Sequence, residues 1–380
     1  MRIEEYRGAP FVDREEEIGF FVEWFSRVPQ RILWVYGPKS SGKTTVMEYV
    51  VERKLLTERE WWIKSKYWVK YLNLRGKLIT SYSSFLDALI VPEEVYEETV
   101  ERNVYLSLGM ICLESKKIKQ VKERKKNLFD VLIEEIDRER RGGRIPVLII
   151  DEIQKLRDVY IRNSNGEREL LKEFLNFCVR LTKEMHLSHV VILTSNTIFI
   201  ERIYNDARLK ETSEFWKVDH LRREQVEKWL EFEGFSDEEI ELVWEYLGGS
   251  IPRLIKVIEA KESGRDLKEH LKREVWLAYT EIVDYLTDFG ERERKYFKEI
   301  AKEIVKKGYY SLEGVTKEKK KLLQDWAEKE ILFYDPLELK VTGNSRVYEK
   351  ALERMIEVHL GEKWTSNFGQ YGKMKKNGKD

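Results

Sequence analysis

The sequence has little cysteine, no net charge and no long hydrophobic run. Only Cys112 and Cys178 occur in 380 residues, without Cys-x-x-Cys spacing, so we expect neither a disulfide framework nor a zinc site. The 69 lysines and arginines are balanced by 69 aspartates and glutamates. The net charge of the whole chain therefore attracts neither nucleic acid nor an anionic membrane.

Apolar runs such as Val147–Ile150 and Val190–Leu193 are far shorter than the roughly 20 residues that span a bilayer. The first residues also lack the apolar region of a signal peptide. We therefore expect a cytoplasmic protein with no membrane partner. The 42% of hydrophobic residues is enough for a core, and the length suggests two or three domains.

Short apolar strands alternate with amphipathic helical stretches as far as residue 220. The predicted strands are Arg31–Tyr36, Tyr67–Leu74, Pro146–Ile150, Val190–Thr194 and Phe215–Val218. This alternation is typical of an α/β domain in which helices cover both faces of a parallel sheet. The sequence predicts such a domain over residues 1–220, with a helical insertion at about 91–126.

Beyond residue 220 the strand pattern stops. Helices are predicted at 222–233, 236–247 and 252–264. We assign them to a small all-helical unit over residues 221–284. Two further helical patterns followed by a turn-rich hairpin predict a winged-helix domain over residues 285–360. The last segment, 361–380, is rich in Gly, Asn and Lys and is expected to be a disordered basic tail.

The strongest motif is a phosphate-binding loop, since residues 37–44 fit G-x-x-x-x-G-K-[ST] at every fixed position. The apolar strand Ile32–Tyr36 leads into the loop, and a helical pattern follows it. The glycines let backbone N–H groups face phosphate oxygens, Lys43 would reach the β- and γ-phosphates, and the Thr44 hydroxyl would ligate Mg²⁺. An ordinary glycine-rich turn is the alternative. The predicted nucleotide-binding residues here are Gly37, Pro38, Lys39, Ser40, Ser41, Gly42, Lys43, Thr44 and Thr45.

A second motif places two carboxylates after an apolar strand. Val147–Ile150 precedes Asp151 and Glu152, and ligands of parallel sheets collect at the carboxyl ends of the strands. Asp151 suits the organisation of Mg²⁺, usually through water, and Glu152 suits a general base that polarises the attacking water. A strand that ends in two acids is by itself more often structural, but the upstream phosphate loop favours the catalytic interpretation.

With these motifs the sequence resembles the archaeal ATPase family of the signal-transduction ATPases with numerous domains, which are relatives of the AAA+ group. The resemblance also rests on Phe11–Ile18, Ile149–Gln154, Val191–Asn196 and Gly248–Arg253. It extends over about residues 8–260 in consistent order. The resemblance implies that the chain binds ATP through a P-loop and has an AAA-type sheet of five parallel strands. It also implies that residues 221–284 form a helical lid.

The resemblance implies roles for further side chains near the nucleotide. The segment containing Arg14 begins a helix that in such ATPases lies beside the adenine. Phe11 and Val12 precede this helix and are expected to touch the base. A helix cap and a salt-bridged first turn are the alternative. Asn196 follows the fourth predicted strand and is expected near the γ-phosphate or the attacking water, unless it only shapes the turn after that strand.

Two arginines are candidates for sensing phosphate charge. Arg253 begins a lid helix behind Pro252, in the position that the resemblance gives to a lid arginine similar to sensor 2. Arg208 follows the Asn196 strand, where related ATPases carry an arginine near the nucleotide or a neighbouring subunit. Most arginines in so charged a chain are solvated surface groups, which is the alternative for both.

Two basic features bear on DNA binding. The segment 116–126 carries seven Lys or Arg and one Glu, which suits a phosphate-contacting patch or an ordinary solvated helix face. The expected recognition helix of the winged helix is lysine-rich, and Arg346 is expected on the wing. Its lysines are Lys317, Lys319, Lys320 and Lys321.

The sequence thus predicts a slow, Mg²⁺-dependent ATPase in which ATP and ADP set the positions of the lid and the winged helix. One output is action on duplex DNA, by likeness to origin-recognition ATPases, which share the order of sheet, lid and winged helix. The alternative is a regulatory switch that binds a protein partner or another copy of itself. A small-molecule phosphotransferase is disfavoured because no acceptor-binding motif is present.

Overall fold

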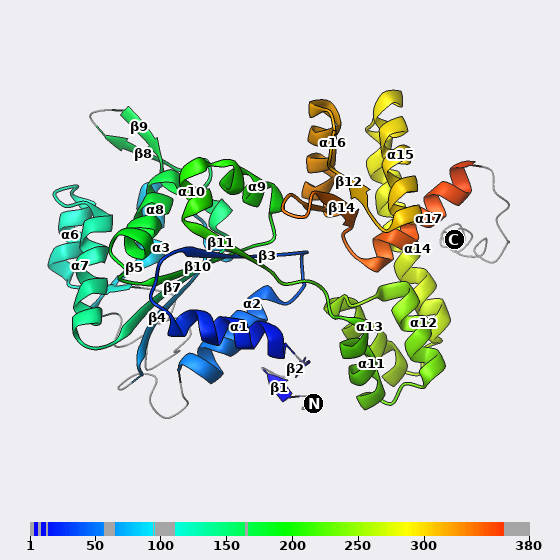
Figure 1. Cartoon of the computed structure of the whole chain (residues 1–380), viewed down its shortest axis with the longest axis horizontal. Helices are drawn as coiled ribbons and strands as arrows, with labels where there is room; N and C mark the ends of the chain where they lie inside the picture. Colours follow the sequence, from blue (N-terminus) through cyan, green and yellow to red (C-terminus); the bar gives the residue numbers. More distant parts are fainter. Residues whose placement is uncertain are drawn as a thin grey trace, which may run out of the picture. The chain divides into compact units, whose positions relative to one another are not determined.

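The computed structural model describes residues 4–6, 9–12, 14–56, 65–93, 95, 111–163 and 166–360. The chain divides into two compact units, Met1–Leu221 and Arg222–Asp380 (Figure 1). The predicted basic tail, 361–380, lies outside the described residues. Within the described residues, no helix combines the length and the apolar character that crossing a membrane requires.

A five-stranded parallel sheet forms the centre of the first unit. Its spatial order is β11 (Ser213–Lys217), β3 (Ile32–Tyr36), β10 (His189–Thr194), β7 (Ile145–Asp151) and β4 (Tyr67–Asn73). All five predicted strands are present, with ends displaced by one or two residues. Because all neighbouring pairs are parallel, the carboxyl ends of the five strands meet at one edge of the sheet. The predicted AAA-type fold is therefore confirmed.

Helices cover both faces of this sheet. Figure 1 shows α1 (Glu15–Ser26) and α2 (Lys43–Val50) on one face, and α8 (Leu170–Val179) and α9 (Thr197–Asn205) on the other. Leu33 and Val35 of β3 belong to the same apolar cluster as residues of α1 and α2, whereas Trp34 lies against Phe199 of α9. A strand that is buried on both faces shows a continuous apolar run, which is why β3 could be predicted without any alternation.

The first unit contains several smaller elements. They are β1 (Glu4–Tyr6), β2 (Ala9–Phe11), α3 (Tyr82–Leu89), β5 (Ile90–Pro92), β6 (Ile111–Leu113), α6 (Ser115–Lys122), α7 (Leu128–Arg141), β8 (Tyr160–Asn163), β9 (Gly166–Glu169) and α10 (Ala207–Glu211). Tighter or wider helical turns lie at Val51–Leu55, Ile153–Leu156 and Arg180–Glu184.

The helical insertion predicted at about 91–126 is only partly helical. Strand β5 pairs in parallel with β6, and the helix α6 follows. Residues 94 and 96–110 lie outside the described part of the chain. The β-branched residues Ile90, Val91 and Ile111 favour extended backbone, but such short runs are too brief to show the two-residue period of a strand.

The second unit contains seven helices and a small sheet among its described residues. The elements are α11 (Arg223–Phe232), α12 (Asp237–Leu247), α13 (Ile251–Glu262), α14 (Leu267–Thr287), α15 (Glu291–Lys307), β12 (Tyr310–Ser311), α16 (Lys317–Glu328), β13 (Leu332–Asp335), β14 (Lys340–Gly343) and α17 (Arg346–Leu360). The three strands form an antiparallel sheet in the order β12, β14, β13. Together with α15 and α16 they have the arrangement of the predicted winged helix. Strand β12 was not predicted, because it has only two residues.

The prediction that Arg346 lies on the wing is wrong. The wing is the turn between β13 and β14, whereas Arg346 begins α17 after β14 has ended. Its Nε donates a hydrogen bond to the carbonyl oxygen of Glu245 in α12 at 3.2 Å, and its Nη1 pairs with Glu349 at 2.9 Å. Arg346 therefore joins two helices of the second unit. The division of this unit at residue 284, near the end of α14, stays a prediction.

Candidate active site

The loop from Gly37 to Thr44 joins β3 to α2 at the carboxyl edge of the sheet. Gly37 has φ of 151°, and a Cβ atom there would lie 2.1 Å from the carbonyl oxygen of Val218. No larger residue fits at that position without displacing backbone. The Ser41 hydroxyl donates to the same carbonyl at 2.7 Å. The segment after β11 therefore fixes one side of the loop. Of the other predicted loop residues, Pro38 is buried and Lys39, Ser40 and Thr45 are exposed.

Lys43 begins α2 and directs its ammonium group back into the loop. Nζ donates to the carbonyl oxygens of Pro38 at 2.6 Å and Gly37 at 3.1 Å, and the residue is only 8% exposed. Burial lowers the pKa of Lys43 to about 8, although the carboxylates of Asp151 and Glu152 oppose this shift. A buried cation within a glycine loop at the start of a helix suits an anion with several oxygens, such as a phosphate chain.

Thr44 and Asp151 meet although 107 positions separate them in the chain. The Thr44 hydroxyl donates to Oδ2 of Asp151 at 2.7 Å, and Asp151 is 2% exposed at the end of β7. Burial raises the pKa of Asp151, so a cation beside it would favour its charged form.

One hydroxyl and one carboxylate are the oxygen ligands that Mg²⁺ prefers. No cluster of three or more His, Cys, Asp or Glu side chains that could hold a metal is found among the described residues. The residues therefore fit a Mg²⁺ ion whose other ligands include phosphate oxygens.

Glu152 follows Asp151 but makes different contacts. Its backbone has φ of 64°, which is uncommon outside glycine, and its N–H donates to the carbonyl oxygen of Leu193 at 3.1 Å. Oε1 accepts a hydrogen bond from Nη2 of Arg75 at 2.8 Å, and Oε2 accepts from Nε2 of Gln154 at 2.5 Å. Both carboxylate oxygens are thus already held by neighbours in this structure.

Arg75 is a site residue that the sequence did not reveal. It lies two residues after β4, which neighbours β7 in the sheet, so both side chains come from the same edge. The order of the strands cannot be read from spacing in the sequence. A basic residue directly after a predicted strand is the only signal that could have identified it.

A chain of hydrogen bonds continues from Glu152 to the neighbouring strand. Gln154 accepts from the Thr194 hydroxyl at 3.0 Å, and that hydroxyl accepts from the N–H of Asn196 at 3.0 Å. Oδ1 of Asn196 in turn accepts from the N–H of Phe199 at 2.9 Å and caps α9. The turn-forming role is therefore present at Asn196, and any contact with phosphate would fall to its amide nitrogen.

Arg14 connects the amino-terminal helix to the phosphate loop. It is 3% exposed, and Nη2 donates to the carbonyl oxygens of Ser41 at 2.7 Å and Asp219 at 3.0 Å. Nη1 pairs with Glu17 at 2.6 Å. The guanidinium group thus holds the loop to the segment after β11, which is a positioning role.

The predicted adenine contacts lie next to the loop helix. The ring of Phe11 stacks on Tyr49 of α2, with centroids 4.2 Å apart, and Val12 is buried. Stacking on an aromatic ring gives Phe11 a structural role of its own in the core around α2. Contact with a base stays a prediction for both residues.

The two candidate sensor arginines lie in different units. Arg253 in α13 forms an ion pair with Glu274 of α14, which is buried, and its guanidinium carbon lies 5.8 Å from the ring centroid of Tyr348. Arg253 therefore has a carboxylate partner inside the second unit. Arg208 belongs to α10 of the first unit, and its side chain is outside the described part of the structure.

The basic segment 116–126 consists of most of the amphipathic helix α6 (Ser115–Lys122) and the turn after it, and its charges are partly paired. Ile118 and Val121 of α6 are buried, Lys122 pairs with Asp87 at 2.8 Å, and Lys125 pairs with Glu123 at 2.7 Å. These pairs favour the alternative of a solvated helix face for this segment.

Comparison with known proteins adds independent findings. Residues 11–257 match the model of a family described as an ATPase domain predominantly from Archaea. An ATP-binding protein of Methanocaldococcus jannaschii is 33% identical over 312 residues, which cover 77% of this chain and 82% of that protein. An ATP-binding protein of Pyrococcus abyssi is 32% identical over 363 residues, which cover 92% and 99%.

One solved structure is similar over most of both chains. It is a Walker-type ATPase of Pyrococcus abyssi, with a TM-score of 0.60 at 16% identity, and the alignment covers 90% of this chain and 96% of that one. At this identity the likeness concerns the fold alone.

Proposed function

This chain belongs to the family of ATPase domains found predominantly in archaea, and we propose that it is a Mg²⁺-dependent ATPase that works as a molecular switch. One observation carries the proposal: a buried lysine, a hydroxyl–carboxylate pair and a second carboxylate meet at one edge of the sheet. These groups belong to Lys43, Thr44, Asp151 and Glu152.

Each part of the site has a separate task in this proposal. The backbone N–H groups of residues 37–45 and the Lys43 ammonium bind the phosphates, and Phe11 and Val12 lie beside the base. Thr44 and Asp151 hold Mg²⁺, which when bound neutralises charge on the phosphate oxygens. To contact phosphate, Lys43 exchanges its hydrogen bonds to the loop carbonyls for bonds to phosphate oxygens. Arg14 keeps the loop in place during this exchange.

Glu152 is the general base. An attacking water forms a bond to the γ-phosphorus, the bond to the leaving ADP oxygen breaks, and the proton of the water passes to a carboxylate oxygen of Glu152. That oxygen must first leave Arg75 or Gln154. The hydrogen-bond chain from Gln154 through the Thr194 hydroxyl to Asn196 orients these side chains. Because this release precedes each turnover, hydrolysis is expected to be slow.

The test compares two variants of the full chain. Lys43→Ala should lose ATP binding in calorimetry, because Lys43 is the buried cation of the loop, whereas the other loop lysine, Lys39, is exposed. Glu152→Gln should bind ATP as the wild type does and lose hydrolysis by orders of magnitude, because an amide cannot accept the proton. Wild-type turnover in Glu152→Gln would refute the role of Glu152, and wild-type affinity in Lys43→Ala would refute the site.

The switch is proposed to act through Arg253 in the lid over residues 221–284. In this proposal Arg253 exchanges Glu274 for the γ-phosphate of ATP, and ADP offers no such partner. The exchange would close the lid and shift the winged helix over residues 285–360. A charge-assisted contact is worth roughly 1.5–3 kcal/mol, which allows about a ten- to hundredfold preference for the closed state.

Hydrogen exchange in α11 and α13 tests this mechanism. Arg253→Ala should narrow the difference in protection between ATP and ADP. Lys256→Ala is a matched control, because Lys256 lies on the same helix with Nζ 3.8 Å from the same Glu274 carboxylate but has no proposed phosphate contact. Equal narrowing in both variants would mean that only the charge of the lid matters.

DNA association is the proposed output, and the winged-helix arrangement in the second unit supports it. The rival output is a protein partner or a further copy of the chain, with Arg208 acting on a neighbouring subunit. A wild-type affinity for duplex DNA that falls steeply with salt would favour the first output, since phosphate contacts release counterions. Absence of that affinity would favour the second.

A further inference from the structure

Helix α15 carries a row of lysines on the side opposite its buried face. Lys295, Lys298 and Lys302 recur at steps of three and four residues, so they share one side of the helix. The residues that α15 buries in the core of the unit are Phe297, Ile300, Ala301 and Ile304. On a helix with 3.6 residues per turn these two sets point in opposite directions. The lysine row therefore faces away from the core.

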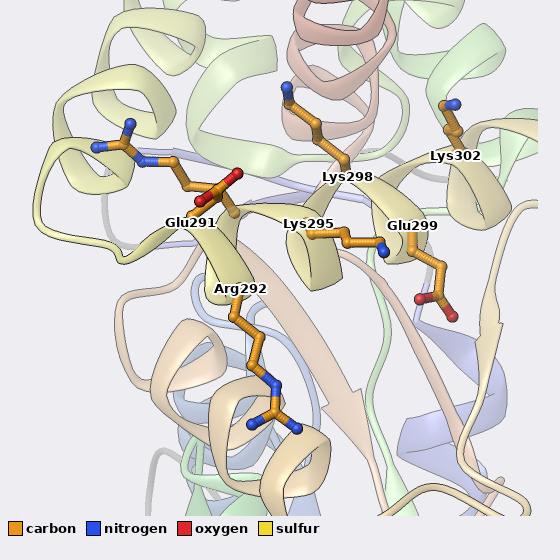
Figure 2. Close-up of a pocket in the computed structure, with 7 residues that line it drawn as sticks. Glu291, Arg292, Lys295, Lys298, Glu299 and Lys302 are labelled. Atoms are coloured by element: carbon orange, nitrogen blue, oxygen red, sulfur yellow. The ribbon is translucent and has the colours of Figure 1, made fainter.

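A hollow of about 880 Å³ runs along this helix. Its lining consists of Glu291, Arg292, Arg294, Lys295, Lys298, Glu299 and Lys302. Figure 2 shows Lys298 and Lys302 extending to one side of α15, and Arg292 and Glu299 extending to the other. Seven basic and four acidic residues occur in the helix as a whole. Of the seven lining residues, five are basic and two are acidic, so the lining is mainly cationic and an anionic occupant is favoured.

The acidic residues of α15 are mostly engaged by groups other than the lysine row. Glu293 accepts a hydrogen bond from the N–H of Gly290 at 2.9 Å, Glu299 pairs with Lys319 at 2.7 Å, and Glu303 pairs with Lys307 at 3.4 Å.

The lysine row itself is unpaired. Across the described ranges, no carboxylate lies within 4.0 Å of the ammonium groups of Lys295, Lys298 and Lys302. The three ammonium groups thus have no ion-pair partner of their own. Two carboxylates, Glu291 and Glu299, line the same hollow, and Glu299 is already paired with Lys319.

In α16, the expected recognition helix, one of the four lysines is held by an acidic residue of α15. Lys319 is held by Glu299 and also lies over the ring of Tyr296, 4.9 Å from its centroid. Glu318 of the same helix pairs with Arg292 at 2.9 Å. Helix α16 has four lysines and three acids, so its net charge is smaller than that of α15.

We infer that Lys295, Lys298 and Lys302 of α15 bind the phosphate backbone of duplex DNA, and that α15 rather than α16 supplies the main electrostatic contact. This inference rests on the proposed DNA association. From Lys295 to Lys302 the row covers seven residue steps, about 10 Å at about 1.5 Å per residue. Phosphates of one strand recur about every 3.4 Å along the duplex axis, so a rigid row of this length can follow several of them. Lysine binds phosphate as a point charge, and such contacts carry no sequence information.

The test measures binding of a short, mixed-sequence DNA duplex to the full chain by fluorescence anisotropy over a salt series. The triple variant Lys295→Gln, Lys298→Gln, Lys302→Gln should lower the slope of log affinity against log salt by about 2.7, because each phosphate contact contributes about 0.9. The control removes the same number of lysines from α16, as Lys317→Gln, Lys320→Gln, Lys321→Gln. It should lower the slope by less than about 0.9. ATP turnover of each variant checks that the site in the first unit is intact.

Each other outcome overturns the inference in a recognisable way. If the α16 variant loses the larger slope, DNA association stands and the assignment to α15 is wrong. If the wild type binds no duplex, both the DNA proposal and the inference fail, while ATP turnover still tests the ATPase proposal separately. If polyglutamate binds the wild type as tightly as the duplex and the α15 variant loses that binding, the row recognises an acidic polypeptide instead.

Discussion

Raising the pH from 7 to 9 should weaken ATP binding, because it removes the charge of Lys43. Burial lowers the pKa of this ammonium group from 10.5 to about 8, and its hydrogen-bond partners are uncharged: two carbonyl oxygens and the Ser41 hydroxyl. A bound triphosphate would surround the same group with negative charge and raise its pKa again. ATP binding above pH 8 must therefore be coupled to the uptake of a proton.

The size of the effect follows from the pKa in the unliganded protein. With a pKa of about 8, about nine tenths of the molecules carry a charged Lys43 at pH 7 and about one tenth at pH 9. If only the charged form binds ATP, the affinity at pH 9 is about tenfold lower than at pH 7. That ratio corresponds to about 1.4 kcal/mol of binding free energy.

Isothermal titration calorimetry at pH 7, 8 and 9, in two buffers of different ionisation enthalpy, measures both the affinity and the proton uptake. Lys43→Arg keeps its charge at all three values, so its affinity should not change with pH. Lys70 of β4 is a control for buried lysines in general, since burial lowers its pKa to about 8 as well. Lys70→Met should keep the tenfold change. A wild-type affinity that is constant from pH 7 to 9 would refute the reasoning.

Three further predictions concern the same unit. Arg75→Ala frees one oxygen of Glu152 and should raise ATP turnover by no more than about fivefold at unchanged ATP affinity. The limit follows because Arg75 is 62% exposed, and an ion pair with so exposed a partner is worth less than about 1 kcal/mol. Turnover below that of the wild type would show that Arg75 positions the base instead. Gly37→Ala should abolish ATP binding and lower Tm, because the Cβ of the alanine would lie 2.1 Å from the Val218 carbonyl oxygen. Gly143→Ala is the control: Gly143 also has positive φ, but no atom lies within 4 Å of its Cβ position, so this variant measures the backbone strain alone. Lys70 binds fewer protons in the folded than in the unfolded chain between pH 8 and 10.5, so the free energy of unfolding should rise with pH across that window. Lys70→Met should remove this rise and stabilise the protein at pH 7 by up to about 3 kcal/mol, which urea titrations at pH 7 and 10 would detect.

The sequence predicts the sheet well because its strands are buried on both faces. Val147–Ile150 and Val190–Leu193 are continuous apolar runs of strand length with helical patterns between them, and only a parallel sheet covered by helices buries such runs completely. The phosphate loop could be predicted for a different reason. Its function depends on backbone conformation over eight consecutive residues, so the whole requirement is written locally.

Contacts between distant segments could not be predicted in this way. Arg75 and Glu152 are 77 positions apart, and Arg14 and Asp219 are 205 apart. Each pair depends on the order of strands in the sheet, which spacing in the sequence does not contain. The sequence predicts Arg346 on the wing because the run Arg346–Tyr348 after the turn-rich segment suits the second half of the hairpin. Its partner Glu245 lies in α12, and only the tertiary fold brings the two together.

The backbone at Glu152 explains how two adjacent acids make different contacts. In a continuing strand Glu152 would point to the opposite face of the sheet from Asp151, away from the edge where ligands collect. The left-handed conformation at Glu152 ends β7, and the residue becomes the cap of the short turn Ile153–Leu156. Its carboxylate then lies at the edge between Arg75 and Gln154, while Asp151 remains beside Thr44. Strain of this kind persists only where surrounding contacts hold it, and here the hydrogen bond to Leu193 and the two side-chain partners do so. In the proposed mechanism, Asp151 would serve the cation and Glu152 would accept the proton, and this backbone conformation separates the two carboxylates accordingly.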